Sequence, residues 1–298
     1  IDCSFLATGF RSATYVERQT ELCAIAAHNF PALDLNHISV RNDDGVAYLE
    51  AMSPVDCIFL DPARRNEHGG KTVAISDCEP NVAKLEGLLL SKANRIMIKL
   101  SPMLDLSQAL KELPHTQEVH IISVNNECKE LLLLLGQTAP EEIPVHCVNL
   151  STKGEQEKQL FVFTREQEQH SECSYTDTLG NYLYEPNASL LKAGAFRSIA
   201  AAYSVKKLHP NSHLYTSETQ IEGFPGRTFR IINRCSLNKK EIKENLSDLK
   251  KANITVRNFP ATVAELRKRI KLAEGGDTYL FASTLNDGQK ILIRCGKV

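Results

Sequence analysis

Hydrophobic and polar residues along positions 13–164 alternate between the periods of strands and helices. Residues 55–60 form an apolar run typical of a buried central strand, whereas residues 21–30 place apolar side chains on one helix face. The same pattern predicts further strands at 13–17, 37–40, 95–100 and 118–124, and further helices at 46–52, 80–90, 104–113 and 127–135. Because strands alternate with helices, we predict an α/β fold with a mostly parallel sheet.

The end of this region has the pattern of an antiparallel hairpin. Apolar segments at 145–149 and 159–164 flank a polar stretch at 153–158. A hairpin here adds antiparallel strands at one edge of the sheet. Residues 165–180 are polar and lack periodicity, so we interpret them as a linker.

After residue 180 the pattern changes to that of a small α+β protein. A helix is predicted at 190–203. It is followed by a strand–helix–strand–helix–strand–strand series at 228–233, 238–251, 252–257, 262–272, 278–282 and 290–294. We therefore expect small α+β domains at the C-terminal end of the chain.

The net charge of −1 conceals an asymmetry between the two halves of the chain. Residues 181–298 hold 20 of the 35 Lys and Arg and 10 of the 36 Asp and Glu, a balance of +10. Residues 1–180 hold the other 15 and 26, a balance of −11. A folded basic region is a candidate for binding a polyanion, although a solvated basic face accounts for the charge equally well.

Composition excludes several other classes of protein. The longest apolar run, near residues 131–135, is far shorter than the ~20 residues of a membrane span, so no membrane partner is expected. The nine cysteines occur singly and without a Cys-x-x-Cys pair, which is typical of reduced thiols in a cytoplasmic protein. The histidines show no metal-ligand spacing, and no metal site is predicted.

Acidic residues follow three of the predicted strands. They are Glu17, the pair Asp43 and Asp44, and Asp61. Parallel sheets bind ligands at the carboxyl ends of their strands, so these carboxylates are candidates for one binding site. The alternative is that Glu17 and Asp44 begin helices and complement the helix dipoles.

The most specific of these segments is Asp61-Pro62-Ala63-Arg64-Arg65. Pro62 fixes its own backbone and restricts Asp61 to an extended conformation. This predicts a rigid turn that presents one carboxylate and two guanidinium groups after a buried strand. The alternative is a turn that only ends the strand, with its arginines paired to neighbouring acids.

Residues 13–164 resemble a class I S-adenosylmethionine-dependent methyltransferase, which has a Rossmann-like sheet. The resemblance rests on the acids after successive strands and on Asp61-Pro62 in the position of that family's fourth-strand motif. Asp-Pro-Ala-Arg-Arg followed by Gly69-Gly70, and Tyr182-Leu-Tyr-Glu-Pro-Asn187, resemble a bacterial group that ends in a THUMP-like domain. The resemblance implies a methyltransferase domain at 1–168, a ferredoxin-like domain at 176–225 and a THUMP-like domain at 226–298.

The resemblance also implies roles for these residues. Glu17 would bind the cofactor ribose, Asp43 and Asp44 the adenine edge, and Asp61 with Pro62 would lie beside the transferable methyl group of S-adenosylmethionine. Arg64 and Arg65 would hold a substrate phosphate, because guanidinium groups bind phosphates bidentately. The implied substrate is RNA, either tRNA or rRNA.

The basic C-terminal region supplies candidates for RNA contacts. Arg227 and Arg230 lie in one predicted strand, and Arg267 and Arg269 lie on one predicted helix. Contacts of this kind bind phosphates without reading sequence. Four aromatic residues would stack on bases or belong to the core: Tyr203, Tyr215, Phe224 and Phe229.

The chain departs from the family at its beginning. A class I methyltransferase opens with a strand and a glycine-rich turn, whereas residues 1–7 have the pattern of the helix that follows them. We expect that strand and turn upstream of Ile1, and weaker S-adenosylmethionine binding by residues 1–298 than by an upstream-extended chain. The alternatives are a non-catalytic RNA-binding protein with a degenerate methyltransferase fold, and a nucleotide-binding oxidoreductase, which Asp61-Pro62 does not support.

Overall fold

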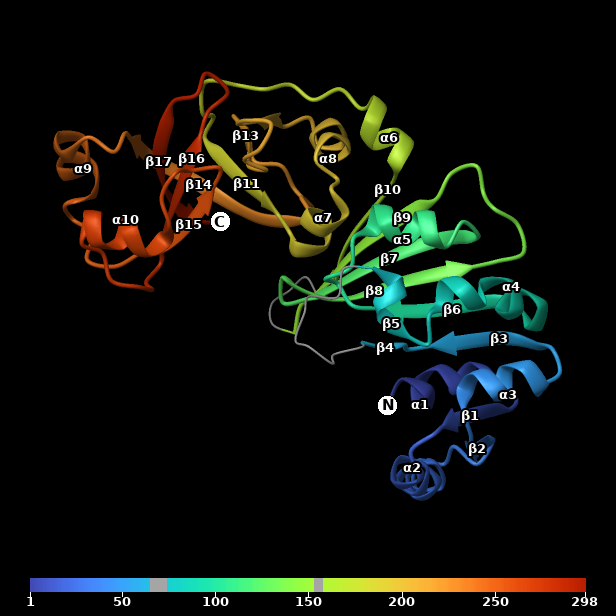
Figure 1. Cartoon of the computed structure of the whole chain (residues 1–298). Coiled ribbons are helices and arrows are strands. Elements are labelled where there is room, and N and C mark those ends of the chain that lie inside the picture. The colour runs from blue at the N-terminus through green and yellow to red at the C-terminus, as the bar shows by residue number, and fades with distance from the viewer. Residues whose placement is uncertain (65–73, 153–157) are drawn as a thin grey trace. The chain divides into compact units, whose positions relative to one another are not determined.

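The structure is a computed structural model that describes residues 1–64, 74–152 and 158–298 (Figure 1). The chain divides into two compact units. The first contains residues 1–98, 103–115 and 134–139, and the second contains 99–102, 116–133 and 140–298. Within the described residues, no helix is both long enough and apolar enough to span a bilayer.

The N-terminal segment forms a small parallel sheet with its own helices. Strands β1 (Ala13–Glu17) and β2 (Ile38–Asn42) pair in register along their whole length. Between them runs helix α2 (Thr20–Ala32), whose Phe30 packs in one cluster with Ala7 and Ile38. Helix α3 (Gly45–Ala51) follows β2, and α1 (Asp2–Leu6) precedes β1.

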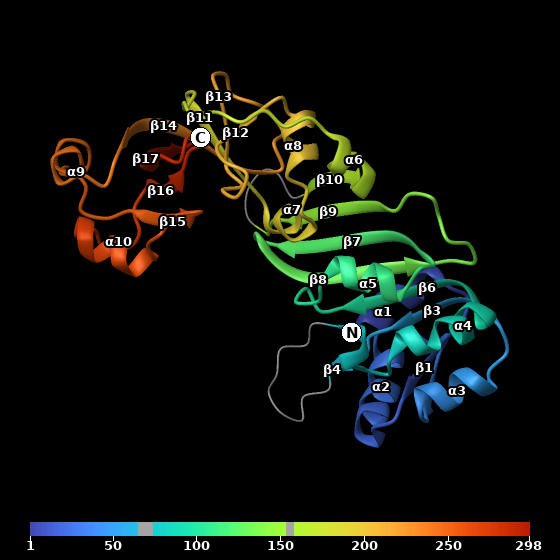
Figure 2. The ribbon, with the colours of Figure 1, turned by 45° about the horizontal axis from the view of Figure 1, so that its top comes forward.

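A six-stranded sheet follows, with the order β10-β9-β7-β8-β6-β3 in the described residues. Its strands are β3 (Val55–Leu60), β6 (Ala93–Leu100), β7 (Thr116–Val124), β8 (Glu127–Leu135), β9 (Pro144–Leu150) and β10 (Lys158–Thr164). β3 pairs parallel with β6, and β7 pairs parallel with β9. β10 pairs antiparallel with β9 at the edge of the sheet, so the predicted mostly parallel α/β fold with an edge hairpin is confirmed. Figures 1 and 2 show β7, β9 and β10 running side by side.

Helices and a short two-stranded ladder connect these strands. Helix α4 (Val82–Lys92) precedes β6 and helix α5 (Leu106–Glu112) precedes β7. The two-residue strands β4 (Ala63–Arg64) and β5 (Cys78–Glu79) pair antiparallel after β3. Asp61 and Pro62 therefore lead directly from β3 into a second, short ladder. Within the described residues β3 ends the strand order of its sheet and is exposed or half-buried, so the prediction of a buried central strand at 55–60 is wrong.

The predicted helix at 127–135 is wrong, because this segment is strand β8. Asn125 and Asn126 both have positive φ values, 51° and 64°, and connect β7 to β8. Two adjacent residues of this conformation form the tight turn that reverses a strand. Leu131, Leu133 and Leu135 are buried while the residues between them are partly exposed, which is the two-residue period of a strand.

The predicted linker at 165–180 begins with helix α6 (Arg165–His170). The Thr164 hydroxyl accepts a hydrogen bond from the Gln167 amide, and the Gln167 side chain accepts one from the Thr164 amide. This reciprocal capping starts a helix even in a polar segment. Residues 165–170 are therefore an ordered element, and the interpretation of this part as a linker is wrong.

The C-terminal half forms a seven-stranded sheet with the order β12-β13-β11-β14-β17-β16-β15. Its strands are β11 (Tyr182–Pro186), β12 (Lys206–Lys207), β13 (Tyr215–Ser217), β14 (Gly226–Cys235), β15 (Asn253–Arg257), β16 (Thr278–Thr284) and β17 (Lys290–Lys297). Helix α9 (Lys239–Leu246) contacts β14, and helix α10 (Val263–Ile270) lies beside β15 (Figure 1). Their Leu246 and Leu266 share a core with the sheet residues Leu280 and Leu292. The predicted order of strands and helices after residue 226 is confirmed.

The helix predicted at 190–203 is two helices. α7 (Ala188–Ala193) ends at Gly194, which has a left-handed φ of 76°, and α8 (Arg197–Ala202) begins three residues later. Glycine adopts this conformation without steric cost and commonly ends helices. The glycine therefore divides an apolar pattern that is continuous in the sequence.

Candidate active site

The acidic residues at the ends of β1 and β2 lie next to one another. Glu17 is the last residue of β1 and pairs with Asn42, the last residue of β2. The Asn42 side-chain amide donates to the Glu17 carbonyl at 3.0 Å, and the Asp43 amide donates to the same carbonyl at 3.2 Å. Two of the predicted strand ends thus form one edge, with Glu17 half-buried and Asp43 and Asp44 exposed.

Backbone amides hold each of these carboxylates by one oxygen. Glu17 Oε1 accepts from the Gln19 amide at 2.8 Å, and Asp43 Oδ1 accepts from the Asp44 amide at 2.8 Å. Asp44 Oδ1 accepts from the amides of Val46 and Ala47 at 2.9 and 3.0 Å, and Asp44 is the N-cap of α3. The alternative prediction, that Asp44 begins a helix, is therefore confirmed. Since Oδ1 makes both bonds, the capping role does not consume the second carboxylate oxygen.

Asp61 lies at the end of the neighbouring sheet strand β3. It is exposed, Pro62 is half-buried, and both lead into β4. The side chain of Arg64 and the whole of Arg65 lie outside the described residues. The predicted binding of a substrate phosphate by these two arginines is therefore not part of the described site.

An ion pair connects the β1 edge to the segment that follows Asp61. Arg18, next to Glu17, lies 3.6 Å from the Glu79 carboxylate. Glu79 belongs to β5 and pairs with Ala63 of β4, two residues beyond Asp61. Both charged side chains are at least half exposed, so the pair contributes little to stability. The pair links the residue after β1 to the short ladder that follows Asp61 and Pro62.

The arrangement offers carboxylate oxygens to donors such as hydroxyl and amine groups. Glu17, Asp43 and Asp44 are fixed by the backbone rather than by flexible side chains. A preorganised acceptor loses little entropy when it binds a ligand. The chemistry of this edge is therefore that of a receptor for a neutral or cationic group rich in hydrogen-bond donors.

A comparison with solved structures finds a similar protein over the whole length of this chain. A crystal structure of a putative methyltransferase from Porphyromonas gingivalis W83 is 35% identical, with a TM-score of 0.87. The alignment covers 100% of this chain and 80% of that chain. Residues 182–225 match a ferredoxin-like domain, and residues 226–297 match a THUMP domain-like family. The chain belongs to the bacterial methyltransferase family that ends in ferredoxin-like and THUMP-like domains.

No curated protein matches the chain.

The ferredoxin-like and THUMP-like segments of this methyltransferase family share one sheet. β11 of the first segment pairs with β14 of the second over five residues, from Tyr182 opposite Arg230 to Pro186 opposite Gly226. The two matched segments are thus joined by a continuous strand ladder.

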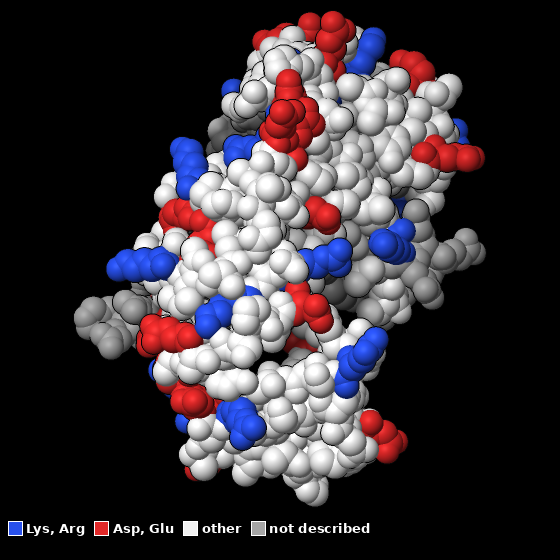
Figure 3. Space-filling view, turned by 90° about the vertical axis from the view of Figure 1, so that its right-hand side faces the viewer, with Lys and Arg blue, Asp and Glu red and all other residues white. Residues whose placement is uncertain are grey.

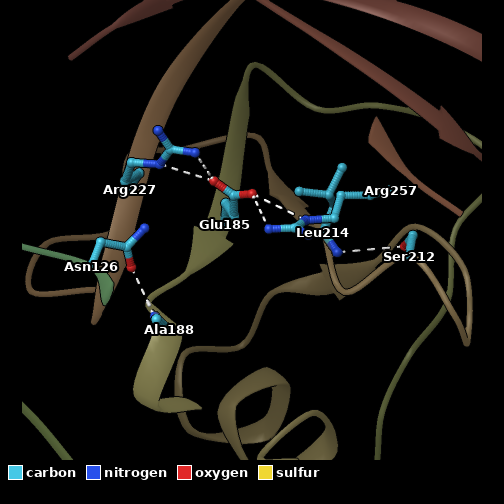
Figure 4. A network of polar contacts seen from close by, with 7 residues as sticks. All are labelled: Asn126, Glu185, Ala188, Ser212, Leu214, Arg227 and Arg257. Carbon is cyan, nitrogen blue, oxygen red and sulfur yellow. Dashed lines mark hydrogen bonds and ion pairs between the residues drawn. The ribbon is translucent and has the colours of Figure 1, made fainter. Parts of the chain in front are cut away.

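A buried carboxylate also joins these two segments (Figure 4). Glu185 is 1% exposed and receives hydrogen bonds from two guanidinium groups, Arg227 on one oxygen and Arg257 on the other. Both arginines use Nε and a terminal nitrogen, and the Arg257 bonds measure 3.1 and 2.8 Å. Arg227, predicted to contact substrate, is therefore committed to an internal ion pair.

The other arginines predicted to contact RNA differ in whether their side chains are already bonded within the protein. Arg267 donates to the Ala252 carbonyl at 3.2 Å, and Arg269 donates to the Leu237 carbonyl at 2.8 Å. Both side chains hold loops next to α10. Arg230 is exposed on β14, and its side chain has no hydrogen bond or ion pair with any residue the structure describes.

The aromatic residues of this region are core rather than platforms. Tyr215, Phe224 and Phe229 are buried, and Tyr203 is half-buried with its hydroxyl donating to the Gly223 carbonyl. Phe224 contacts the rings of both Tyr203 and Tyr215. The alternative that these rings pack the interior is the correct one for three of the four.

The sequence reasoning missed Glu185 and Arg257. The available signal was a glutamate inside the apolar segment Tyr182-Leu-Tyr-Glu-Pro, because a charge in a buried strand requires a partner. The partners themselves lie 42 and 72 residues away in the chain. Pattern alone does not find such pairings.

Proposed function

We propose that this methyltransferase transfers a methyl group from S-adenosylmethionine to RNA. The observation that carries the proposal is the shared edge of Glu17, Asp43 and Asp44, which the Arg18–Glu79 ion pair links to the ladder after Asp61 and Pro62. The family adds that the chain is a methyltransferase. The charge of +10 in residues 181–298 and the THUMP domain-like segment support an RNA substrate.

The acceptor set at this edge fits the adenosine half of S-adenosylmethionine. Glu17 has one oxygen on the Gln19 amide and a second that would accept from the ribose hydroxyls. Asp43 and Asp44 would accept from the adenine amine at the end of the adjacent strand. Two hydroxyls and one amine are donors, and this edge of the sheet presents acceptors.

Asp61 would orient the group that receives the methyl. When bound, S-adenosylmethionine supplies a methyl group on a sulfonium, a good leaving group. The protein then contributes mainly position, so Asp61 would accept a hydrogen bond or a proton from the RNA nucleophile. Pro62 restricts the backbone at Asp61 and limits the directions that its carboxylate samples.

The RNA would be held by basic side chains from two parts of the chain. Arg64 and Arg65 follow Asp61 in the sequence and would bind a phosphate beside the target nucleotide. Exposed Arg230 would contact the backbone elsewhere, whereas Arg267 and Arg269 would contribute to the field around α10. We further propose a methyltransferase domain at 1–168, domains at 176–225 and 226–298 that present the RNA, and a cytoplasmic location.

Binding of S-adenosylmethionine by the purified protein tests the cofactor part of this proposal. Glu17→Gln removes a charged acceptor but keeps its shape, and we expect binding roughly tenfold to hundredfold weaker by isothermal titration. Glu21→Gln is a matched control, because Glu21 is exposed in the first turn of α2. Asp44→Asn is a second test of cofactor binding. It removes the charge of Asp44 but keeps the cap of α3, because asparagine caps a helix as well as aspartate does. Equal binding by Glu17→Gln and the wild type would contradict the assigned role.

A further inference from the structure

A separate cluster of metal-binding side chains lies on β7 and β9. Glu118 and His120 are two residues apart on β7, and His146 is the direct partner of His120 on the parallel strand β9. Residues two apart on a strand point to the same face, and so do direct partners on adjacent strands. The sheet therefore places two imidazoles and one carboxylate together on one face.

The ligand atoms of these three side chains are close enough to share one ion. His120 Nε2 lies 3.3 Å from Glu118 Oε2, and His146 Nε2 lies 3.9 Å from the same oxygen. One ligand atom from each residue lies within 4.8 Å of the others. Zinc binds nitrogen and oxygen at about 2.0–2.2 Å, which puts neighbouring tetrahedral ligands roughly 3.3 Å apart. The first pair already has this separation, the second pair is about 0.6 Å wider, and the two imidazole nitrogens lie within 4.8 Å of each other, so binding needs the side chains to move closer together.

The cluster combines a rigid base with an open side. On the opposite face of the same strands, Val119, Ile121 and Val145 are fully buried and fix the backbone. The imidazoles of His120 and His146 are 27% and 26% exposed, and the Glu118 side chain is 45% exposed. Solvent therefore reaches the ligand atoms and can complete the coordination of an ion. Three protein ligands with one position left to water is a common arrangement for zinc.

We propose that Glu118, His120 and His146 form a binding site for a divalent transition-metal ion, with Zn²⁺ as the best fit. Two imidazoles and a carboxylate suit zinc, iron and nickel, and they disfavour magnesium and calcium, which prefer oxygen alone. The two rings stack with centroids 4.4 Å apart and planes 10° apart. Binding requires the rings to rotate about their side-chain bonds so that both Nε2 lone pairs converge on the ion.

The site is independent of the methyl-transfer chemistry proposed above. All three ligands belong to the second compact unit, whereas Glu17, Asp44 and Asp61 belong to the first. An ion here would tie β7 to β9, which are already neighbours in the sheet. Its direct consequence is therefore a higher melting temperature of the loaded protein, because a ligand that binds only the folded state stabilises it.

Metal titration of the whole protein tests the proposal. After removal of bound metal with a chelator, Zn²⁺ is titrated by calorimetry in competition with a chromogenic zinc indicator. We expect one high-affinity Zn²⁺ per chain, and binding at least about tenfold weaker in His120→Asn, His146→Asn and Glu118→Gln. His28→Asn is the matched control, because His28 is exposed on α2.

A second measurement separates this site from the nine cysteines. Co²⁺ bound by imidazole and carboxylate gives ligand-field bands without the near-ultraviolet absorption of a cobalt–thiolate bond. Such a spectrum, lost in Glu118→Gln, would support the site even if a histidine variant folded poorly. No zinc binding, unchanged binding in all three variants, or a thiolate spectrum would each overturn the proposal.

Discussion

At the scale of single residues, Glu185 is a buried charge on which two arginines depend. This carboxylate is almost fully buried, while its partners Arg227 and Arg257 are 39% and 36% exposed. A buried charge is tolerated only when it is paired, and here each oxygen has its own guanidinium. The two arginines belong to β14 and β15, so the carboxylate connects three strands.

Glu185→Gln should destabilise the protein by about 3 kcal/mol, because it leaves two guanidinium groups without their counter-charge. The free energy of unfolding from urea titration measures this loss. Asp248→Asn is the control, since Asp248 pairs bidentately with Arg294 but is 61% exposed. An exposed pair of this kind contributes little to stability, so Asp248→Asn should cost much less than Glu185→Gln. Equal losses in the two variants would contradict the special role of the buried carboxylate.

His213 makes stability depend on pH. Burial, and then the charges of Lys207 and Arg257, lower the pKa of His213 from 6.5 to about 4. Its ring stacks on Phe196 with centroids 3.6 Å apart. Below pH 6.5 the unfolded chain binds a proton that the folded chain rejects until about pH 4, so stability falls as pH falls through this window.

Between pH 7.5 and pH 5 we expect this group to remove about 1 kcal/mol of stability, after allowance for its partial exposure. His213→Asn should abolish this part of the pH dependence. Asparagine tolerates the positive φ of 52° at this position. Urea unfolding at the two pH values measures it, with His28→Asn as the control. The same slope in His213→Asn and the wild type would exclude His213 as the source.

At the scale of elements, the sequence predicts the order of strands and helices better than their ends. The parallel strands and the series after residue 226 follow from period alone. β8 was missed because five consecutive leucines, 131–135, fit a helix as well as a strand. The decisive signal was the Asn125-Asn126 turn. α6 was missed because its signal is a capping pair and not an apolar stripe.

The junction of β11 and β14 depends on a glycine. A Cβ on Gly226 would lie 2.9 Å from the Pro186 Cα and closer still to the Glu185 carbonyl oxygen. Gln159 of β10 also bonds this segment, with its amide donating to the Gly226 carbonyl at 3.1 Å and its oxygen accepting from Asn187. The backbone of β11 therefore leaves no room for a side chain at Gly226.

Gly226→Ala should lower the free energy of unfolding by roughly 2–3 kcal/mol, since overpacking against backbone forces the strands apart. Gly296→Ala is the matched control in the same sheet. Its Cβ would meet only the end of the Ile232 side chain, at 3.9 Å. Urea unfolding of both variants measures the difference. A Gly226→Ala protein as stable as Gly296→Ala would contradict the close approach of β11 and β14.

At the scale of the whole molecule, the acidic and basic halves of the sequence do not give every face of the protein a single sign of charge. Figure 3 shows one face on which acidic and basic side chains are interspersed over a mainly uncharged surface. Several arginines counted in the basic half are also committed to internal bonds, as Arg227 and Arg294 are. The net charge of residues 181–298 therefore overstates the number of basic side chains that are free to contact RNA.

The candidate site was predictable in part. The three strand ends that carry Glu17, Asp43 with Asp44, and Asp61 follow from the α/β pattern, because such sheets place ligands there. The bonds that fix these carboxylates, and the Arg18–Glu79 pair, depend on which strands lie side by side. Those contacts join residues far apart in the chain, so the sequence pattern does not contain them.

The function we propose for this chain is methyl transfer from S-adenosylmethionine to RNA, with Asp61 beside the reacting atom. Incubation of the purified protein with RNA and cofactor carrying a labelled methyl group tests it most directly. We predict label in the RNA with the wild type and with Asp56→Ala, an exposed acid on the same strand. Asp61→Ala should incorporate at least about a hundredfold less label. Full incorporation by Asp61→Ala, or none by the wild type, would contradict the account.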